Sequence, residues 1–209
     1  GSYVGIWNNN VVSVRQNGHD VFFEGICLDG NLEDEVNSYF DLDRDYEEIK
    51  KKLLKVDENM RISIKYGDGI RILNQDLWET IISFIISANN NIPRIKGIIE
   101  RLSKQYGKQI KWNNQIYYTF PTPEDVTVEE YRKLGLGFRD IRIYETTKMI
   151  LEKKVDLEEL KKNPNTLEVR EKLLTLSGVG PKVADCILLF STLKRFEVFP
   201  IDVWVRRVM

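Results

Sequence analysis

The sequence predicts an α+β fold: a mainly helical body with a helix-hairpin-helix motif, plus a small N-terminal antiparallel sheet domain. Two patterns support this prediction. Residues 1–30 hold short runs of β-branched and aromatic residues separated by asparagine and glycine turn signals, whereas from residue 43 onward the apolar residues recur at helical spacing. We therefore predict a partial β domain over residues 1–42 and a helical body over residues 43–209.

The β domain is predicted from three short runs, residues 3–7, 11–14 and 21–23. The pair Asn17-Gly18 before the third run is typical of a hairpin turn. An isolated sheet of this size is only marginally stable, so we expect it to pack on helices from elsewhere in the chain.

The helical body is predicted from apolar stripes and breaker residues. The expected helices cover residues 46–54, 57–66, 76–87, 92–106, 127–134, 138–153, 157–160, 166–176 and 181–193. The helix over 76–87 is apolar on nearly all sides, which predicts a central buried helix. Residues 107–123 are expected to be a loop, with short extended pieces at 70–73, 116–118 and 196–199. A last helix from Pro200 stops barely two turns later, so we expect the chain to be truncated there.

Composition excludes several classes of protein. The longest apolar runs are far shorter than the roughly 18–20 residues of a membrane span. Cys27 and Cys186 lie far apart in the sequence, so free thiols in a reducing, intracellular compartment are expected. The single histidine, His19, gives no metal-ligand spacing with them, so no zinc site is predicted. The net charge of −1 does not by itself indicate a nucleic-acid binder.

The most informative segment runs from Leu176 to Cys186 and reads Leu-Ser-Gly-Val-Gly-Pro-Lys-Val-Ala-Asp-Cys. Its glycines predict a tight turn between two helices, and the proline fits the first turn of the second helix. Backbone N–H groups beside a helix N-terminus suit a phosphate. Lys182 is out of place on structural grounds, because the helix dipole disfavours a cation in the first turn.

The spacing places chemically useful groups together. Lys182, Cys186 and either Leu189 or Phe190 share one helix face, and Asp202 follows a return segment toward it. An amine beside a carboxylate suits nucleophilic attack on a sugar carbon that develops positive charge. Each residue also has a plainer interpretation: Lys182 as a surface lysine, Asp202 as a helix N-cap and Cys186 as a core thiol.

Four collinear segments between residues 39 and 204 resemble the 8-oxoguanine DNA glycosylases. The hairpin segment, with Val-Phe-Pro-Ile-Asp-Val at 198–203, resembles that family's helix-hairpin-helix and aspartate. Residues 84–95, with Ser-Ala-Asn-Asn-Asn-Ile-Pro-Arg, resemble its asparagine segment, and residues 134–139 resemble its Leu-Gly-Leu-Gly-Tyr-Arg. Residues 39–43 match a segment in its N-terminal half. Phe138, Pro181 and Trp204 stand where the family commonly has tyrosine, threonine and, in eukaryotic members, histidine.

The resemblance implies a role for each site residue. Lys182 would be the nucleophile, with Asp202 as the stabilising carboxylate, and Cys186 and Phe190 would line the base pocket. The residues that fill the opened duplex and contact the orphaned cytosine would be Asn89, Asn90, Arg94, Phe138 and Arg139. Those that contact DNA phosphate would be Gly178, Val179, Gly180 and Trp204. The family's pocket also uses residues upstream of residue 1 and beyond Met209.

The expected function is therefore excision of 8-oxoguanine from double-stranded DNA, followed by strand cleavage at the abasic site. The alternatives are a monofunctional helix-hairpin-helix glycosylase for another damaged base, including an iron–sulfur enzyme, and a non-enzymatic module that binds the DNA backbone. We expect a monomer without a membrane partner, in the cytoplasm or nucleoid if the source is prokaryotic. No cofactor is expected, although the hairpin leaves room for a structural monovalent or divalent cation.

Overall fold

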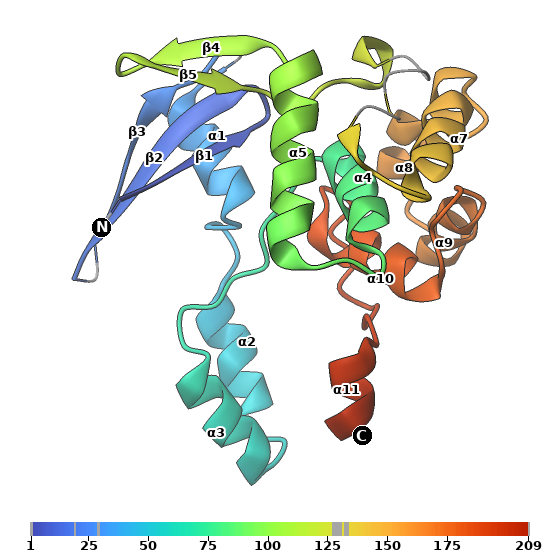
Figure 1. The fold of residues 1–209 in the computed structure, drawn as a ribbon. Coiled ribbons are helices and arrows are strands. Elements are labelled where there is room, and N and C mark those ends of the chain that lie inside the picture. The colour runs from blue at the N-terminus through green and yellow to red at the C-terminus, as the bar shows by residue number, and fades with distance from the viewer. Residues whose placement is uncertain (1, 19, 29, 127–130, 132–133, 209) are drawn as a thin grey trace.

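The structure is a computed structural model that describes the chain except for residues 1, 19, 29, 127–130, 132–133 and 209. A three-stranded sheet lies beside a helical body, as the sequence predicted (Figure 1). The predicted helix over residues 127–134 and the single histidine, His19, lie mostly or wholly outside the described residues.

The N-terminal sheet is an antiparallel meander of β1 (Ser2–Trp7), β2 (Asn10–Asn17) and β3 (Asp20–Ile26), which confirms the three predicted strands. Trp7 pairs with Asn10, so Asn8 and Asn9 alone form the first turn, at φ angles of 46° and 62°. Asparagine tolerates this left-handed region, and a two-residue turn of this kind matches the twist of the flanking strands.

One face of the sheet has its own small core. The helix α1 (Leu32–Tyr39) packs on it, and Trp7, Val12 and Val36 are buried between them. The ring of Trp7 stacks on that of Tyr39, with the centroids 4.3 Å apart. Aromatic stacking of this kind adds to the free energy gained from burial alone.

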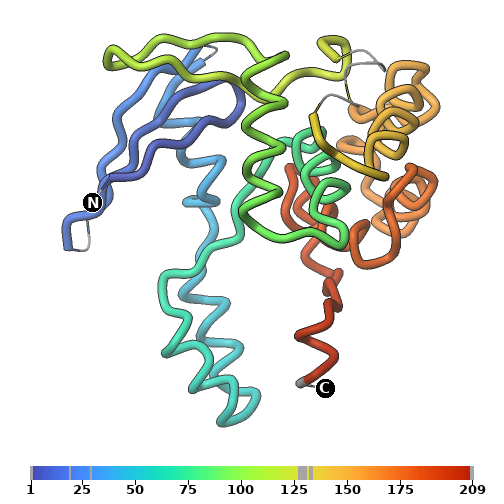
Figure 2. Tube along the Cα trace, viewed as in Figure 1, coloured from blue at the N-terminus to red at the C-terminus, as the bar shows by residue number. Residues whose placement is uncertain are grey.

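The helical body surrounds α4 (Leu77–Ser87), the predicted central helix. Its buried residues are Leu77, Trp78, Thr80, Ile81, Ile82, Ile85 and Ile86. Around it lie α5 (Ile92–Tyr106), α7 (Arg139–Leu151), α8 (Leu157–Lys162), α9 (Thr166–Leu174) and α10 (Pro181–Phe190). The helices α2 (Tyr46–Leu53), α3 (Glu58–Tyr66) and α11 (Val203–Val208) extend from the same end of this body (Figures 1 and 2).

The loop expected at residues 107–123 is mostly a β-hairpin. Its strands are β4 (Gln109–Trp112) and β5 (Gln115–Tyr118), followed by the short 3-10 helix η1 (Pro123–Asp125). Asn113 and Asn114 form its turn at positive φ, in the same way as Asn8 and Asn9. The extended piece expected at residues 116–118 is part of β5, whereas the first strand was missed because it has only four residues, although the Trp-Asn-Asn turn signal occurs in both hairpins.

The structure also refines several smaller predictions. Residues 70–73 and 196–199, expected to be short extended pieces, form no strand. Asn165 caps α9, and the Thr166 hydroxyl donates to the Glu197 carboxylate. The last helix begins at Val203 instead of Pro200, and Asp202 caps it, which confirms the N-cap interpretation of that residue. Within the described part of the chain, no helix has the length and apolar character to cross a membrane.

A buried carboxylate joins the sheet domain to the body. Asp41 follows α1 and pairs with Arg44 at 2.8 Å and with Lys194 at 3.1 Å, while the Tyr46 hydroxyl donates to it at 3.0 Å. Arg71 donates to its backbone oxygen at 2.8 Å. Burial alone raises the pKa of Asp41, but the hydrogen bonds from Lys194 and Tyr46 and the charges of Lys194 and Arg44 outweigh burial and hold the pKa below its usual value.

We predict that Asp41→Asn lowers the free energy of unfolding by about 1–3 kcal/mol at pH 7, because it leaves the buried bonds to charged groups weakened. A carboxyl whose pKa is lowered by folding stabilises the protein above its unfolded pKa, and this contribution is lost as the pH falls through the folded pKa. The difference between wild type and variant in urea unfolding should therefore shrink below about pH 4. A difference that stayed constant down to pH 2 would contradict this role of the charge.

Candidate functional site

The turn between α9 and α10 depends on Gly178. Its φ is +86°, and an added Cβ would lie 3.0 Å from Cδ of Arg142 and 3.3 Å from Cγ2 of Ile85. Gly180 is different: its backbone is extended and nothing lies within 4 Å of an added Cβ. Pro181 then occupies the first turn of α10, as predicted. One glycine is therefore required by packing, and the other leaves an open approach to the backbone.

The hairpin is held rigidly on α7. The Thr146 hydroxyl donates to the Ser177 carbonyl at 3.0 Å, and the Ser177 hydroxyl donates to Glu145 at 2.6 Å. Val179 is buried and donates its own N–H to the Leu176 carbonyl, so this N–H does not serve a phosphate as expected. Among the described residues, the N–H groups of the two flanking glycines make no backbone hydrogen bond and keep that capacity.

Lys182 is half-buried in the first turn of α10, and its amine faces an aromatic ring. Its Nζ lies 5.2 Å from the centroid of the Phe84 ring on α4. That ring in turn stacks on Phe190, with the centroids 6.3 Å apart and the planes 22° apart. The two rings form an apolar wall beside the amine, and the face of a phenyl ring attracts a cation at this distance.

Cys186 lies one turn further along the same face and is only 3% exposed. Burial raises the pKa of its thiol, while the hydrogen bond and the charge of Lys182 lower it and the charges of Asp185 and Asp202 raise it. The thiol is therefore neutral near pH 7. Asp185 is itself paired with Arg170 at 2.6 Å, so of the two carboxylates whose charge reaches Cys186, only Asp202 has no ion pair with a described residue.

Asp202 is a helix N-cap, and it also keeps one carboxylate oxygen for chemistry. Its Oδ1 accepts hydrogen bonds from the backbone N–H groups of Trp204 at 2.9 Å and Val205 at 2.8 Å, so it caps α11. Its second carboxylate oxygen has no hydrogen-bond partner among the described residues. One oxygen is thus fixed by the helix, and the other is free to act on a neighbouring charge.

The asparagine segment after α4 is a capping loop. Asn89 has a φ of 50° and an exposed side chain without a protein partner among the described residues. The Asn90 side chain donates to the Ile86 carbonyl at 3.0 Å, and Asn91 caps α5 through the N–H of Arg94. The expected contact of Asn90 with an opened duplex is therefore not supported, because its amide closes the end of α4.

Arg139 differs most from its expected role. It is 2% exposed and donates to the carbonyl oxygens of Ala88 at 2.6 and 2.9 Å, Asn89 at 2.7 Å and Leu136 at 3.2 Å. Burial, together with the charges of Arg94 and Arg142, lowers the pKa of Arg139. In this structure the guanidinium holds the end of α4 and does not reach solvent, so it is not available to a base.

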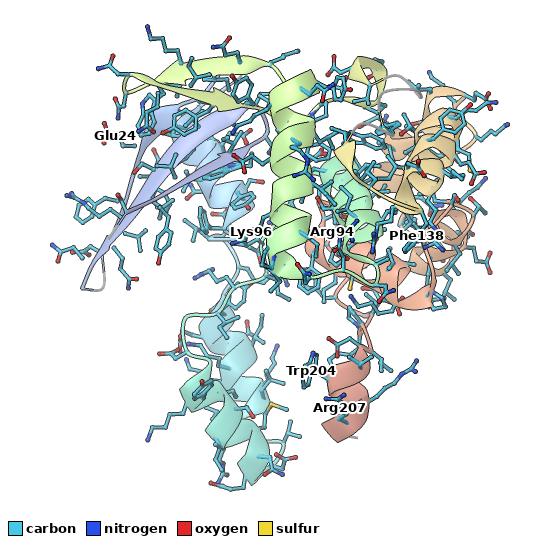
Figure 3. All side chains as sticks on the ribbon, viewed as in Figure 1. Glu24, Arg94, Lys96, Phe138, Trp204 and Arg207 are labelled. Atoms are coloured by element: carbon cyan, nitrogen blue, oxygen red, sulfur yellow. The ribbon has the colours of Figure 1, made fainter. Side chains whose placement is uncertain are left out.

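Two segments that are distant in the sequence nevertheless meet as predicted. Arg94 is exposed and donates to the Gly135 carbonyl at 3.3 Å, and Phe138 is 53% exposed beside the guanidinium of Arg139. Figure 3 shows Arg94 and Phe138 on adjacent parts of the helical body, and Trp204 with Arg207 on α11. Trp204 is 66% exposed. These exposed side chains remain available for the predicted contacts.

Phe84 is the site residue that sequence reasoning missed. Its position on the central apolar helix predicted only a core role, and no local pattern distinguishes it from the neighbouring isoleucines. Only the packing of α4 on α10 brings its ring to Lys182. Within the described residues, no group of three or more His, Cys, Asp or Glu side chains could hold a metal ion.

The fold and the site define a class: a helix-hairpin-helix protein with an amine, a thiol and a carboxylate beside the hairpin. A family model described as the N-terminal domain of 8-oxoguanine DNA glycosylase matches residues 1–81. The probable N-glycosylase/DNA lyase of Methanothermobacter thermautotrophicus is 33% identical over 201 residues, covering 85% of this chain and 63% of that protein. The N-glycosylase/DNA lyase of Saccharomyces cerevisiae is 33% identical over 218 residues, covering 95% and 57%.

Solved structures show the same relationship over the whole chain. The apo form of Clostridium acetobutylicum 8-oxoguanine glycosylase/lyase is 42% identical with a TM-score of 0.92, and the match covers 100% of this chain and 73% of that one. Its complex with double-stranded DNA containing cytosine opposite 8-oxoguanine gives 42% and 0.90. The chain belongs to the 8-oxoguanine DNA glycosylase family. It spans less than two thirds of the length of the two curated relatives.

We predict that Arg139→Lys destabilises the protein by about 1–3 kcal/mol, because one ammonium cannot replace a planar guanidinium that serves three carbonyls. Amide hydrogen exchange at residues 88–91 should accelerate more than elsewhere. Arg206→Lys on the exposed face of α11 is the matched control and should leave both measurements unchanged. Equal stability of Arg139→Lys and wild type in urea unfolding would contradict the capping role.

Proposed function

We propose that this protein excises 8-oxoguanine from double-stranded DNA and then cleaves the strand at the resulting abasic site. The observation that carries the proposal is the position of Lys182 at the hairpin, where its amine lies against the Phe84 ring and its charge acts on the neutral thiol of Cys186, a thiol that the charge of Asp202 also reaches. The family relationship supports the same activity, because its solved members include a glycosylase/lyase.

The chemistry follows from the amine. The neutral amine of Lys182 attacks C1′ of a nucleotide turned out of the duplex, so that a bond from Nζ to C1′ forms and the bond from C1′ to the base breaks with the electron pair leaving on the base. Nζ then loses one of its two protons, and the bond from C1′ to O4′ breaks with O4′ taking up a proton, which opens the sugar ring and gives a protonated Schiff base. β-Elimination removes a proton from C2′, forms the double bond between C2′ and C3′, and breaks the bond between C3′ and its phosphate oxygen, so that the phosphate leaves.

Asp202 supplies the matching charge. The sugar carbon becomes positive as the base leaves, and the free oxygen of Asp202 stabilises that charge while its partner oxygen stays on the α11 backbone. The Cys186 thiol and the Phe190 ring provide an apolar, uncharged lining for the base. The glycine N–H groups of the hairpin and the indole of Trp204 are positioned for DNA phosphates.

The opened duplex requires a wedge on the other side of the site. Phe138 is exposed and lies beside Arg94 and Asn89, so an apolar ring and two polar side chains point outward from adjoining loops. We propose that Phe138 enters the base stack and that Asn89 and Arg94 contact the orphaned base. The protein would act as a monomer where the genome lies, in the cytoplasm or nucleoid of a prokaryote.

Two alternatives make different demands on the same residues. A monofunctional glycosylase activates water and does not need the amine, and a backbone-binding module needs the hairpin but not Lys182 with Asp202. The half-buried amine of Lys182 is a nucleophile that neither alternative needs, and it therefore favours the lyase.

The decisive measurement is borohydride trapping with an 8-oxoguanine:cytosine duplex, using the protein at its full natural length. Wild type should form a covalent adduct with DNA, and Lys182→Gln should reduce the adduct by more than about 100-fold because no other amine occupies this position. Lys172→Gln, an exposed lysine on α9, is the control and should trap normally. Persistence of the adduct in Lys182→Gln would overturn the assigned nucleophile, and wild type that binds DNA without any adduct would favour the backbone-binding module.

A second prediction concerns Phe84, which acts on Lys182 without touching the substrate. Phe84→Leu removes the ring but keeps apolar bulk, and should slow adduct formation about two- to tenfold, because the attacking amine is then held less precisely in its position. Phe84→Tyr keeps the ring face and should stay within about twofold of wild type. Both variants should have similar melting temperatures. Equal slowing in the two variants would show that the residue serves packing and not the position of the amine.

A further inference from the structure

A groove lies between the sheet domain and the helical body, away from the hairpin. It consists of two adjoining cavities of about 520 and 470 Å³ that share Ile6, Glu79 and Phe120. The first cavity continues to the β1–β2 turn and to residues 120–124, and the second continues along α5 to β5. We call the two cavities together the sheet–helix groove.

The first cavity carries four carboxylates and no basic side chain. Glu35 accepts a hydrogen bond from Asn8, and Asp76 caps α4. The carboxylates of Glu79 and Glu124 have no hydrogen bond or ion pair with any described residue, although Glu79 is half-buried. Burying a carboxylate without a partner costs free energy, so this wall of the groove is electrostatically incomplete.

The same cavity has aromatic walls. Trp7 is 6% exposed, and its indole N–H has no hydrogen-bond partner in the described part of the chain. By contrast, Trp78 donates its indole N–H to the Pro121 carbonyl at 2.9 Å. Buried indole N–H groups are normally paired, so the Trp7 N–H is an exception, but it lies beneath the surface and does not face the cavity. The cavity thus offers negative charge and ring surface.

The chemistry excludes two kinds of ligand. The four carboxylates of the first cavity repel a phosphate backbone, so DNA does not fit that cavity. The groove also provides no cluster of side chains with the arrangement of a metal site, within the residues described. An organic cation with an apolar stem matches both the charge of the first cavity and its rings.

We propose that the sheet–helix groove is a docking site for a protein partner that inserts an arginine or lysine side chain between Glu79 and Glu124, with a neighbouring apolar residue against Phe120. The second cavity is lined by Ile99, Ile116 and Tyr118, so it accommodates that apolar residue. Charge complementarity selects the partner, and the apolar contact adds affinity.

The groove lies at the opposite end of α4 from the DNA-facing loop. Asp76 and Glu79 are at its first turn, whereas Asn89 follows its last turn. A helix of 11 residues is about 16 Å long, so a partner in the groove and DNA at the hairpin do not occupy the same space. The site therefore suits a partner that stays bound while the protein is on DNA. This inference does not depend on the proposed reaction.

Binding should increase with pH. Burial, followed by the charge of Asp76, raises the pKa of Glu79 to about 7, so its carboxylate becomes charged between about pH 6 and 8. The other groups that face it are Tyr39 from α1, Lys96 and the paired Lys104 and Glu100 from α5, and Glu35 and Glu124 in the first cavity. Glu79 is therefore the group whose change of charge we expect to control binding in this pH range.

The test uses a capped tripeptide, acetyl-Leu-Arg-Leu-amide, followed by fluorescence of Trp7 and Trp78 and by calorimetry. We expect a Kd of about 0.1–1 mM that tightens at least threefold from pH 6 to pH 8, and at least about tenfold weaker binding of acetyl-Leu-Glu-Leu-amide. Glu79→Gln should remove the pH dependence, and Glu124→Gln, an exposed position, should weaken binding about three- to tenfold. Glu24→Gln on β3, labelled in Figure 3 and outside the groove, is the matched control.

The proposal is overturned if the arginine peptide does not bind at about 10 mM, or if Glu124→Gln and Glu24→Gln bind it equally well. Concentration-dependent self-association that is lost in Glu124→Gln would identify a second copy of the chain as the occupant, and would also overturn it. Borohydride trapping should be normal in Glu124→Gln, so failure here and failure of the proposed reaction are distinguishable.

Discussion

Burial of α4 is the constraint on which the rest of the structure depends. Seven of its eleven residues are buried, and each large apolar side chain contributes about 1.5–3 kcal/mol when removed from water. Ile85 packs against the hairpin glycine, Phe84 faces the lysine, and the carbonyl oxygens after its last turn bind Arg139. A shift of this helix along its axis would therefore alter the hairpin, the amine and the loop that follows α4 together.

The arrangement also explains how a cation can occupy the start of α10. The helix dipole disfavours Lys182 there, but the face of the Phe84 ring acts in the opposite direction. The amine is thus held by weak, opposing interactions instead of one strong ion pair. Such an amine can change partners at little cost, whereas Asp185, bound tightly to Arg170, cannot.

The sequence was sufficient for features with a local physical cause. The central helix follows from apolar residues on all its sides, and the hairpin follows from Gly178, Pro181 and their spacing. The collinear motifs single out Lys182, Asp202, Arg94 and Phe138 as site residues, and these assignments stay predictions. The first strand of the β4–β5 hairpin was missed although Asn113-Asn114 repeats the first turn, because this strand has only four residues.

Features that arise from long-range packing could not be predicted. From the sequence alone, the arginine at position 139 could be exposed or buried. It is buried because its guanidinium binds the carbonyl oxygens that follow the last turn of α4. These carbonyls belong to Ala88 and Asn89, which are 51 and 50 residues away in the sequence. In the same way, Glu79 has the pattern of an ordinary first-turn acid, and the sheet domain that buries it is distant in the chain.

Only one of the two carboxylate oxygens of Asp202 binds the α11 backbone, and this affects the conformational entropy of the side chain. A free aspartate samples several rotamers, and ordering it when a substrate arrives would weaken binding. Here two backbone N–H groups already fix Oδ1, so the direction of the other oxygen is set when α11 forms. The entropy lost by orienting the Asp202 side chain is therefore lost during folding and not during binding of a ligand. The stability of the six-residue helix α11 thus contributes to the preorganisation of the site.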